Sequence, residues 1–199
     1  TSISSLTNTV AATIIIDGIS AEDPAKITGA INNSNASGIV KLYIAAVVEG
    51  TITNAGQLDI IGGTTAAITN NAGGTVFVKR GSTGAITNNS TTTREMTLDG
   101  SSWTPTIGIE SEANNATTIG SIENKVGATI ILDGKSATKP VTVTGTINND
   151  HASGLIRLYI DVIVEGTITN IGQLLVIGAT TAAIDNNAGG TIFMQRGST

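Results

Sequence analysis

The residues best suited to covalent catalysis are almost absent from this chain. It contains a single histidine, His151, and no cysteine. A catalytic triad would need that imidazole, yet the residue 116 positions earlier in an internal repeat is Asn35, so the repeat does not require a base there. A zinc site with several histidine or cysteine ligands is excluded as well. We therefore expect no enzyme of these kinds and no cofactor.

The carboxylates could act as a general acid and base pair or as ligands for calcium. Asp17, Asp99 and Asp133 each precede a glycine, which places each of them in a turn of its own. Glycoside hydrolysis needs two carboxylates that face one bond, and this pattern does not provide them. The three aspartates are the only residues that we consider for Ca²⁺ between stacked turns, but the glycine-rich signature of calcium-binding β-rolls is missing. We expect no metal.

The aromatic residues are the remaining candidates for contact with a ligand. Tyr43 and Tyr159 occupy the same position of the repeat, and Trp103 lies with Pro105 in an irregular segment that resembles an exposed loop. An aromatic ring offers a flat apolar face on which a sugar ring can stack. Loops on a rigid scaffold often carry binding residues. Trp103, Tyr43 and Tyr159 are therefore our candidate contacts with a glycan or a host protein.

The composition excludes several other classes of protein. Only 13% of the residues are charged, and the formal net charge of −5 gives no basic face for nucleic acid. No apolar run approaches the roughly 20 residues of a membrane span. The abundance of β-branched residues, glycine and asparagine is opposite to that of a disordered chain, and it indicates many short strands joined by tight turns.

Two copies of one sequence account for the whole chain. Residues 1–83 align with residues 117–199 without a gap, and 53 of the 83 pairs are identical. The first repeat therefore covers 1–116, and 117–199 is a second, partial repeat that continues the same structure. The segment 84–116 has no second copy and is the least regular part. The chain reads as an excerpt from a longer tandem array, or as a short member of one.

A shorter unit recurs within each copy, namely an aliphatic residue, any residue, and then asparagine. It precedes a glycine- or alanine-containing turn and a β-branched run, at a spacing of about 19 residues, which is too short to bury its own apolar face. Stacking such units would align the asparagines into a hydrogen-bonded ladder. The members are Asn8, Asn33, Asn54, Asn70, Asn88, Asn124, Asn149, Asn170 and Asn186.

This recurrence predicts an all-β chain folded as a right-handed parallel β-helix of about ten irregular rungs. The alternative is a tandem of immunoglobulin-like β-sandwich domains, because a repeat of 116 residues is close to the length of such a domain. The sandwich would not require the shorter internal unit, which is why we favour the β-helix.

Segments such as Gly50–Leu58 and Ile68–Val76 resemble the repeats of bacterial surface β-solenoids, namely autotransporter passenger domains and filamentous haemagglutinin-like adhesins. The resemblance covers most of the chain and implies a secreted protein at the cell surface. We expect a structural stalk or filament that associates end to end with itself, with no nucleic acid partner and no membrane span. The alternatives are an adhesin for a glycan or host protein and a polysaccharide-active β-helix enzyme.

Overall fold

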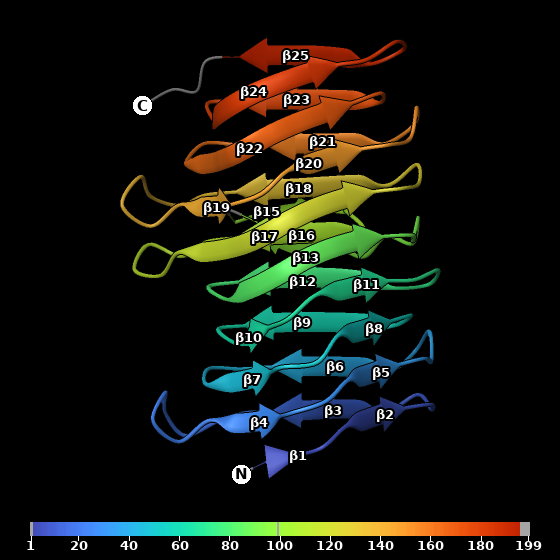
Figure 1. Ribbon diagram of the computed structural model, residues 1–199, viewed down its shortest axis with the longest axis vertical. Helices are drawn as coiled ribbons and strands as arrows, with labels where there is room; N and C mark the ends of the chain where they lie inside the picture. The colour runs from blue at the N-terminus through green and yellow to red at the C-terminus, as the bar shows by residue number, and fades with distance from the viewer. Residues whose placement is uncertain (1, 99, 196–199) are drawn as a thin grey trace.

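The computed structural model describes residues 2–98 and 100–195, which form 25 β-strands connected by turns. The chain climbs as a parallel coil from one end of a rod to the other (Figure 1). The near strands of Figure 1 run from left to right, the far strands run from right to left, and the chain rises, so the coil is right-handed. Parallel pairing along the whole rod confirms the predicted β-helix and excludes tandem sandwiches, whose strands are antiparallel.

Sheet A, as we name the 14-stranded sheet, is the near face in Figure 1. In the early turns each passage across it consists of two short strands, and in several later turns the two merge into one long strand. Its strands are β1 (Ser2–Ile3), β2 (Leu6–Asn8), β4 (Ala25–Ile27), β5 (Ile31–Asn33), β7 (Ala46–Val48), β8 (Ile52–Asn54), β10 (Thr64–Thr65), β11 (Ile68–Asn70), β13 (Ser82–Asn88), β17 (Thr117–Asn124), β19 (Val141–Val143), β20 (Ile147–Asn149), β22 (Val162–Asn170) and β24 (Thr180–Asn186).

Sheet B, the nine-stranded sheet, is the far face and receives one strand from every turn of the coil. Its strands are β3 (Thr13–Ile16), β6 (Ile39–Leu42), β9 (Gln57–Ile61), β12 (Thr75–Lys79), β16 (Ile107–Glu110), β18 (Thr129–Asp133), β21 (Leu155–Leu158), β23 (Gln173–Ile177) and β25 (Thr191–Gln195). The coil therefore has nine turns where we expected about ten, because part of the irregular segment leaves the coil.

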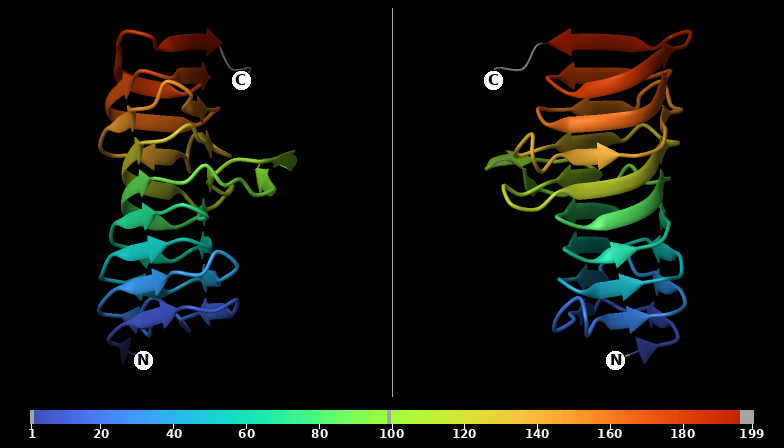
Figure 2. Two further views of the ribbon diagram at one scale, coloured as in Figure 1. Left: turned by 90° about the vertical axis from the view of Figure 1, so that its right-hand side faces the viewer. Right: turned by 60° about the vertical axis from the view of Figure 1, so that its left-hand side comes forward.

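That part forms a two-stranded antiparallel hairpin of β14 (Met96–Leu98) and β15 (Ser101–Trp103). Figure 2 shows it standing out from the rod on the side of sheet B. Gly100 lies in the tight connection with a φ of 71°, a conformation that glycine adopts without steric cost.

The core lies between the two sheets, because alternate residues of each strand point inward. In sheet A, Ile52, Ile68 and Ile86 pair in register and are each at most 1% exposed. In sheet B, Leu58 and Val76 form a matching column and are fully buried. Since every turn adds one layer of aliphatic side chains, the core is continuous along the rod. No helix among the described residues is long and apolar enough to cross a membrane.

Candidate functional site: asparagine column and hairpin cleft

The structure brings all nine predicted asparagines into one column, in which each ends a strand of sheet A. The side-chain Nδ2 of each asparagine donates to the Oδ1 of the asparagine in the next turn, at 2.8–3.0 Å. The eight from Asn8 to Asn170 are at most 2% exposed, whereas Asn186 in the last turn is exposed. All eight bonds run in the same direction, from the N-terminal end of the rod toward the C-terminal end.

Each asparagine also closes the turn that follows it. Asn70 Nδ2 donates to Gly74 O at 3.0 Å, and Asn54 Nδ2 donates to Gly56 O at 2.8 Å. A Cβ at Gly74 would collide with Asn70 Oδ1, which explains why a residue without a side chain stands there. The asparagine side chains therefore donate the hydrogen bonds that the buried backbone carbonyls of this corner need. Their amide groups also bond to one another, so they are not available to a ligand.

The hairpin packs on the outer face of sheet B. Its neck is closed by a hydrogen bond from Arg94 N to Pro105 O at 3.1 Å, and Arg94 Nη2 lies 2.6 Å from Asp59 Oδ1 in β9. Met96 and Leu98, at the two ends of β14 in the hairpin, are 5% and 0% exposed. A Cβ at Gly108 would meet the Met96 sulfur at 2.7 Å, so glycine in β16 makes room for the hairpin.

The effect of the hairpin is seen by comparing the two copies of the repeat. Ile15 in β3 and Ile131 in β18 are equivalent residues that point outward from sheet B in the same column. Ile15 is 60% exposed, whereas Ile131, which pairs with Gly108 beneath the hairpin, is 2% exposed. The hairpin thus adds a local third layer over Ile131, whereas Ile15 lies in the terminal strand of sheet B and, among the described residues, is covered neither by a hairpin nor by a strand on its other side.

Two of the three predicted aromatic contacts meet at the upper edge of this layer. The Trp103 and Tyr159 rings lie 5.6 Å apart between centroids at an angle of 50°. The Arg157 guanidinium lies 5.4 Å from the centre of the Trp103 ring, and its Nη1 is 3.5 Å from the Tyr159 hydroxyl. Tyr43 is half-buried five turns below Tyr159, about 24 Å away at the usual strand spacing, so it belongs to a different surface.

Trp103 and Tyr159 line an open cleft of about 300 Å³ between the hairpin and the sixth to eighth turns. The other wall carries charged groups, namely Asp133, Lys135 and Asp161. Asp161 has a φ of 58°, and Ala45, its counterpart in the first copy, has a φ of 61°, so the two copies share one corner geometry. The cleft therefore combines aromatic surface with carboxylate acceptors and an ammonium donor.

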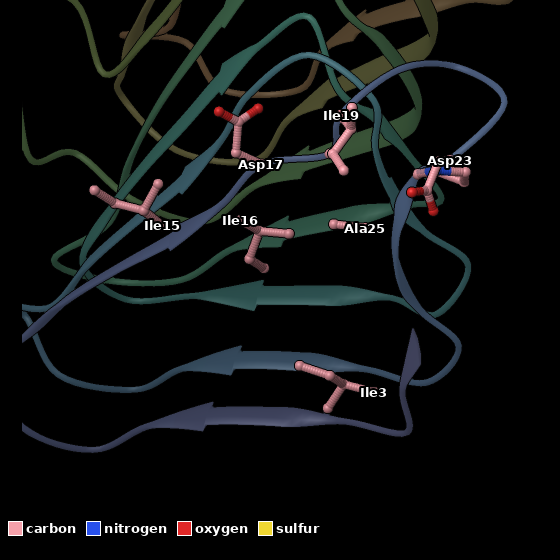
Figure 3. Close-up of a pocket in the computed structure, with 9 residues that line it drawn as sticks. Ile3, Ile15, Ile16, Asp17, Ile19, Asp23 and Ala25 are labelled. Carbon is pink, nitrogen blue, oxygen red and sulfur yellow. The ribbon is translucent and has the colours of Figure 1, made fainter. Parts of the chain in front are cut away.

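A second pocket, near the N-terminal end of the rod, shares only the Asp17–Ile19 corner with the repeat positions of this cleft, and Figure 3 shows it. Asp17 lies there beside the aliphatic side chains of Ile15, Ile16 and Ile19. Here no aromatic residue and no hairpin contribute to the lining.

The two calcium candidates that the structure describes, Asp17 and Asp133, are not brought together. Asp17 and Asp133 lie in different turns at equivalent corners, and Asp99 lies outside the described residues. Across residues 2–98 and 100–195, no group of three or more histidine, aspartate or glutamate side chains could hold a metal ion.

A cluster of ion pairs fixes the corner next to the hairpin. Glu110 is buried and lies 3.0 Å from Lys135 Nζ and 3.6 Å from Lys79 Nζ. Glu112 contacts Lys79 at 3.3 Å and Arg80 at 3.1 Å. Burial raises the pKa of Glu112, but the hydrogen bonds from Lys79 and Arg80 and their positive charges outweigh it, so the pKa is lowered. Glu112 therefore stays ionised, and the cluster holds Lys135 at the cleft.

Three charged residues at the cleft were not predicted, namely Lys135 and Asp161 in its lining and Arg157, which contacts both aromatic rings. Each occupies a repeat position at which the two copies differ. The aligned residues of the first copy are Ile19, Lys41 and Ala45. The sequence signal that could have identified Arg157 and Asp161 was a difference between the two copies within two residues of Tyr159. The path of the hairpin toward Tyr159 had no sequence signal, because 84–116 has no second copy to compare.

No family model, no curated protein and no solved structure matches this chain. Its architecture and the chemistry of its surfaces are therefore the basis for the functional proposal that follows.

Proposed function

We propose that this protein is an extracellular structural repeat protein, a rigid stalk or filament unit that associates end to end with further copies of itself. Two kinds of support exist. The rod has one continuous aliphatic core and one continuous asparagine column, so bending it would disrupt packing along its whole length. The cell-surface location rests on the resemblance of its repeats to surface β-solenoids.

The observation that carries end-to-end continuation, into a further repeat of a longer chain or onto another copy, is the apolar surface at the C-terminal face of the described residues. Met194 in β25 and Ile16 in β3 belong to one inward column of sheet B, whose inner members Leu42 and Val176 are 0% and 3% exposed. Met194, by contrast, is 66% exposed at the C-terminal face. A turn stacked on this face would bury it as the inner turns bury their equivalents.

The outward column of sheet B leads to the same proposal. Ile15 and Phe193 are its first and last members, and they are 60% and 57% exposed. Among the described residues β3 and β25 each pair with one neighbour in sheet B, so a further turn, in the same chain or in another copy, can pair with either edge. Stacking the C-terminal face of one rod on the N-terminal face of another would pair these edges and bring Phe193 beside Ile15.

The test is electron microscopy and sedimentation velocity of the purified chain over a range of concentrations. We expect rods whose lengths are multiples of about 43 Å, because nine turns rise about 4.8 Å each. The Phe193→Asp variant should shift the population to single rods, because it places a carboxylate in the contact. Ile44→Asp is the matched control, since Ile44 is 53% exposed on a lateral corner rather than on an end face. Single rods for the unmodified chain at millimolar concentration would refute self-association.

A further inference from the structure

We propose that the cleft between the hairpin and the seventh turn binds a pyranose unit of a glycan. This inference does not depend on end-to-end association, because the cleft lies on the side of the rod. Its lining combines the two aromatic residues with Ser101, Lys135 and Asp161. A volume of about 300 Å³ lies at the lower end of the range for small-molecule sites.

The aromatic wall suits the apolar face of a sugar ring. A pyranose presents several C–H groups on one face, and these pack on the electron-rich face of an aromatic ring. Trp103 and Tyr159 are both only half-buried, although they contact each other. Arg157 holds them in place, because it stacks on Trp103 and approaches the Tyr159 hydroxyl. The platform is therefore fixed before a ligand arrives, which lowers the entropy lost on binding.

The polar wall suits hydroxyl groups rather than a phosphate or another anion. Asp161 lines the cleft, and its negative charge would repel an anion. The ammonium group of Lys135 is held by Glu110 at 3.0 Å, so most of its charge is neutralised within the protein. Sugar hydroxyls can donate to a carboxylate and accept from an ammonium group, and such charge-assisted bonds are stronger than neutral ones.

Comparison of the two copies supports a specific role for these groups. The equivalents of Lys135 and Asp161 are Ile19 and Ala45, so the first copy keeps the corner and Asp17 but lacks these two charged side chains. Tyr43 is retained there, yet no tryptophan stands near it, because Trp103 is the single tryptophan of the chain. The second copy thus has polar groups that the shared backbone geometry does not require.

The experiment begins with a printed array of neutral and amino-sugar oligosaccharides, followed by titration of the bound ones. Because Trp103 is the single tryptophan, its fluorescence reports on this cleft alone. We expect a saturable change in Trp103 emission for at least one oligosaccharide class. Two variants and a control then locate the site.

Tyr159→Ala should weaken binding about tenfold, the effect of losing one aromatic stacking contact. Tyr43→Ala, at the same position of the other copy, should leave binding unchanged. Asp161→Ala should weaken binding to a similar extent and should fold normally, since alanine is the native residue at that corner in the first copy.

Three results would overturn the proposal. The first is an array on which the unmodified chain binds no oligosaccharide. The second is equal affinity of the Tyr159→Ala and Tyr43→Ala variants. The third is release of reducing ends from a bound oligosaccharide that Asp161→Ala abolishes, which would make the cleft a hydrolytic site instead.

Discussion

At the scale of single residues, the asparagine column is the feature that most constrains the sequence. Asn70 accepts from Asn54, donates to Asn88 and donates to Gly74 O. Its position could be predicted because an identical residue must stand in every turn for the amides to meet. The cleft residues could not be predicted in this way, since Asp161 and Lys135 differ from their counterparts in the other copy.

We predict that Asn70→Ala lowers the free energy of unfolding by about 2–4 kcal/mol. The change removes three buried hydrogen bonds, to Asn54, Asn88 and Gly74 O, at about 0.5–1.5 kcal/mol each. Guanidinium unfolding followed by circular dichroism measures the effect. Asn186→Ala is the control, because Asn186 is exposed in the last turn. This substitution should lower the free energy of unfolding by less than about 1 kcal/mol. Equal costs at the two positions would show that burial of the column is unimportant.

At the scale of elements, the regular strands follow from their sequence, whereas the hairpin's placement does not. Thr75–Lys79 alternates inward and outward residues, and its register on Gln57–Ile61 is set by the columns of the core. The hairpin depends on the contacts of Leu98 and Arg94 with strands far away in the sequence. Those contacts follow no periodic pattern in the sequence. The sequence therefore indicates an irregular segment over 84–116 but not its position over sheet B.

We predict that the hairpin is an addition to the rod rather than a part of its coil. Replacement of residues 95–104 by Gly-Gly should preserve the β-sheet circular dichroism, because the neck from Arg94 to Pro105 is already closed by a hydrogen bond. The variant should melt at a lower temperature and bind more of an apolar dye, since Ile131 becomes exposed. Loss of the β-sheet signal would mean that the fifth and sixth turns cannot pair without the hairpin.

At the scale of the whole molecule, one 116-residue repeat corresponds to five turns of coil. Five strands of sheet B, from β3 to β16, fall within residues 1–116, and β17 then begins the second copy in register. The lengths of the turns differ, but the strands keep their columns. The irregular spacing in the sequence is therefore absorbed by the corners.

We predict that placing a further copy of residues 1–116 before the chain gives one longer rod. Five more turns should extend it by about 24 Å. The hairpin of the added copy should also cover the Ile15 that follows it, as the present hairpin covers Ile131. Small-angle X-ray scattering measures the length, and hydrogen exchange at β3 measures the protection. Two separately tumbling bodies would contradict a continuous coil.

The single direction of the asparagine bonds has an electrical consequence. Along a parallel β-coil the peptide groups of each strand point alternately up and down, so their dipoles largely cancel. The asparagine amides do not alternate, because every Nδ2 donates toward the C-terminal face. Their dipoles add along the axis, with the positive pole at Asn186 and the negative pole at Asn8. The asparagine column therefore gives the rod a net dipole moment along its axis, which should align the rod in an applied electric field. In a fibre, the dipoles of successive rods would favour head-to-tail alignment.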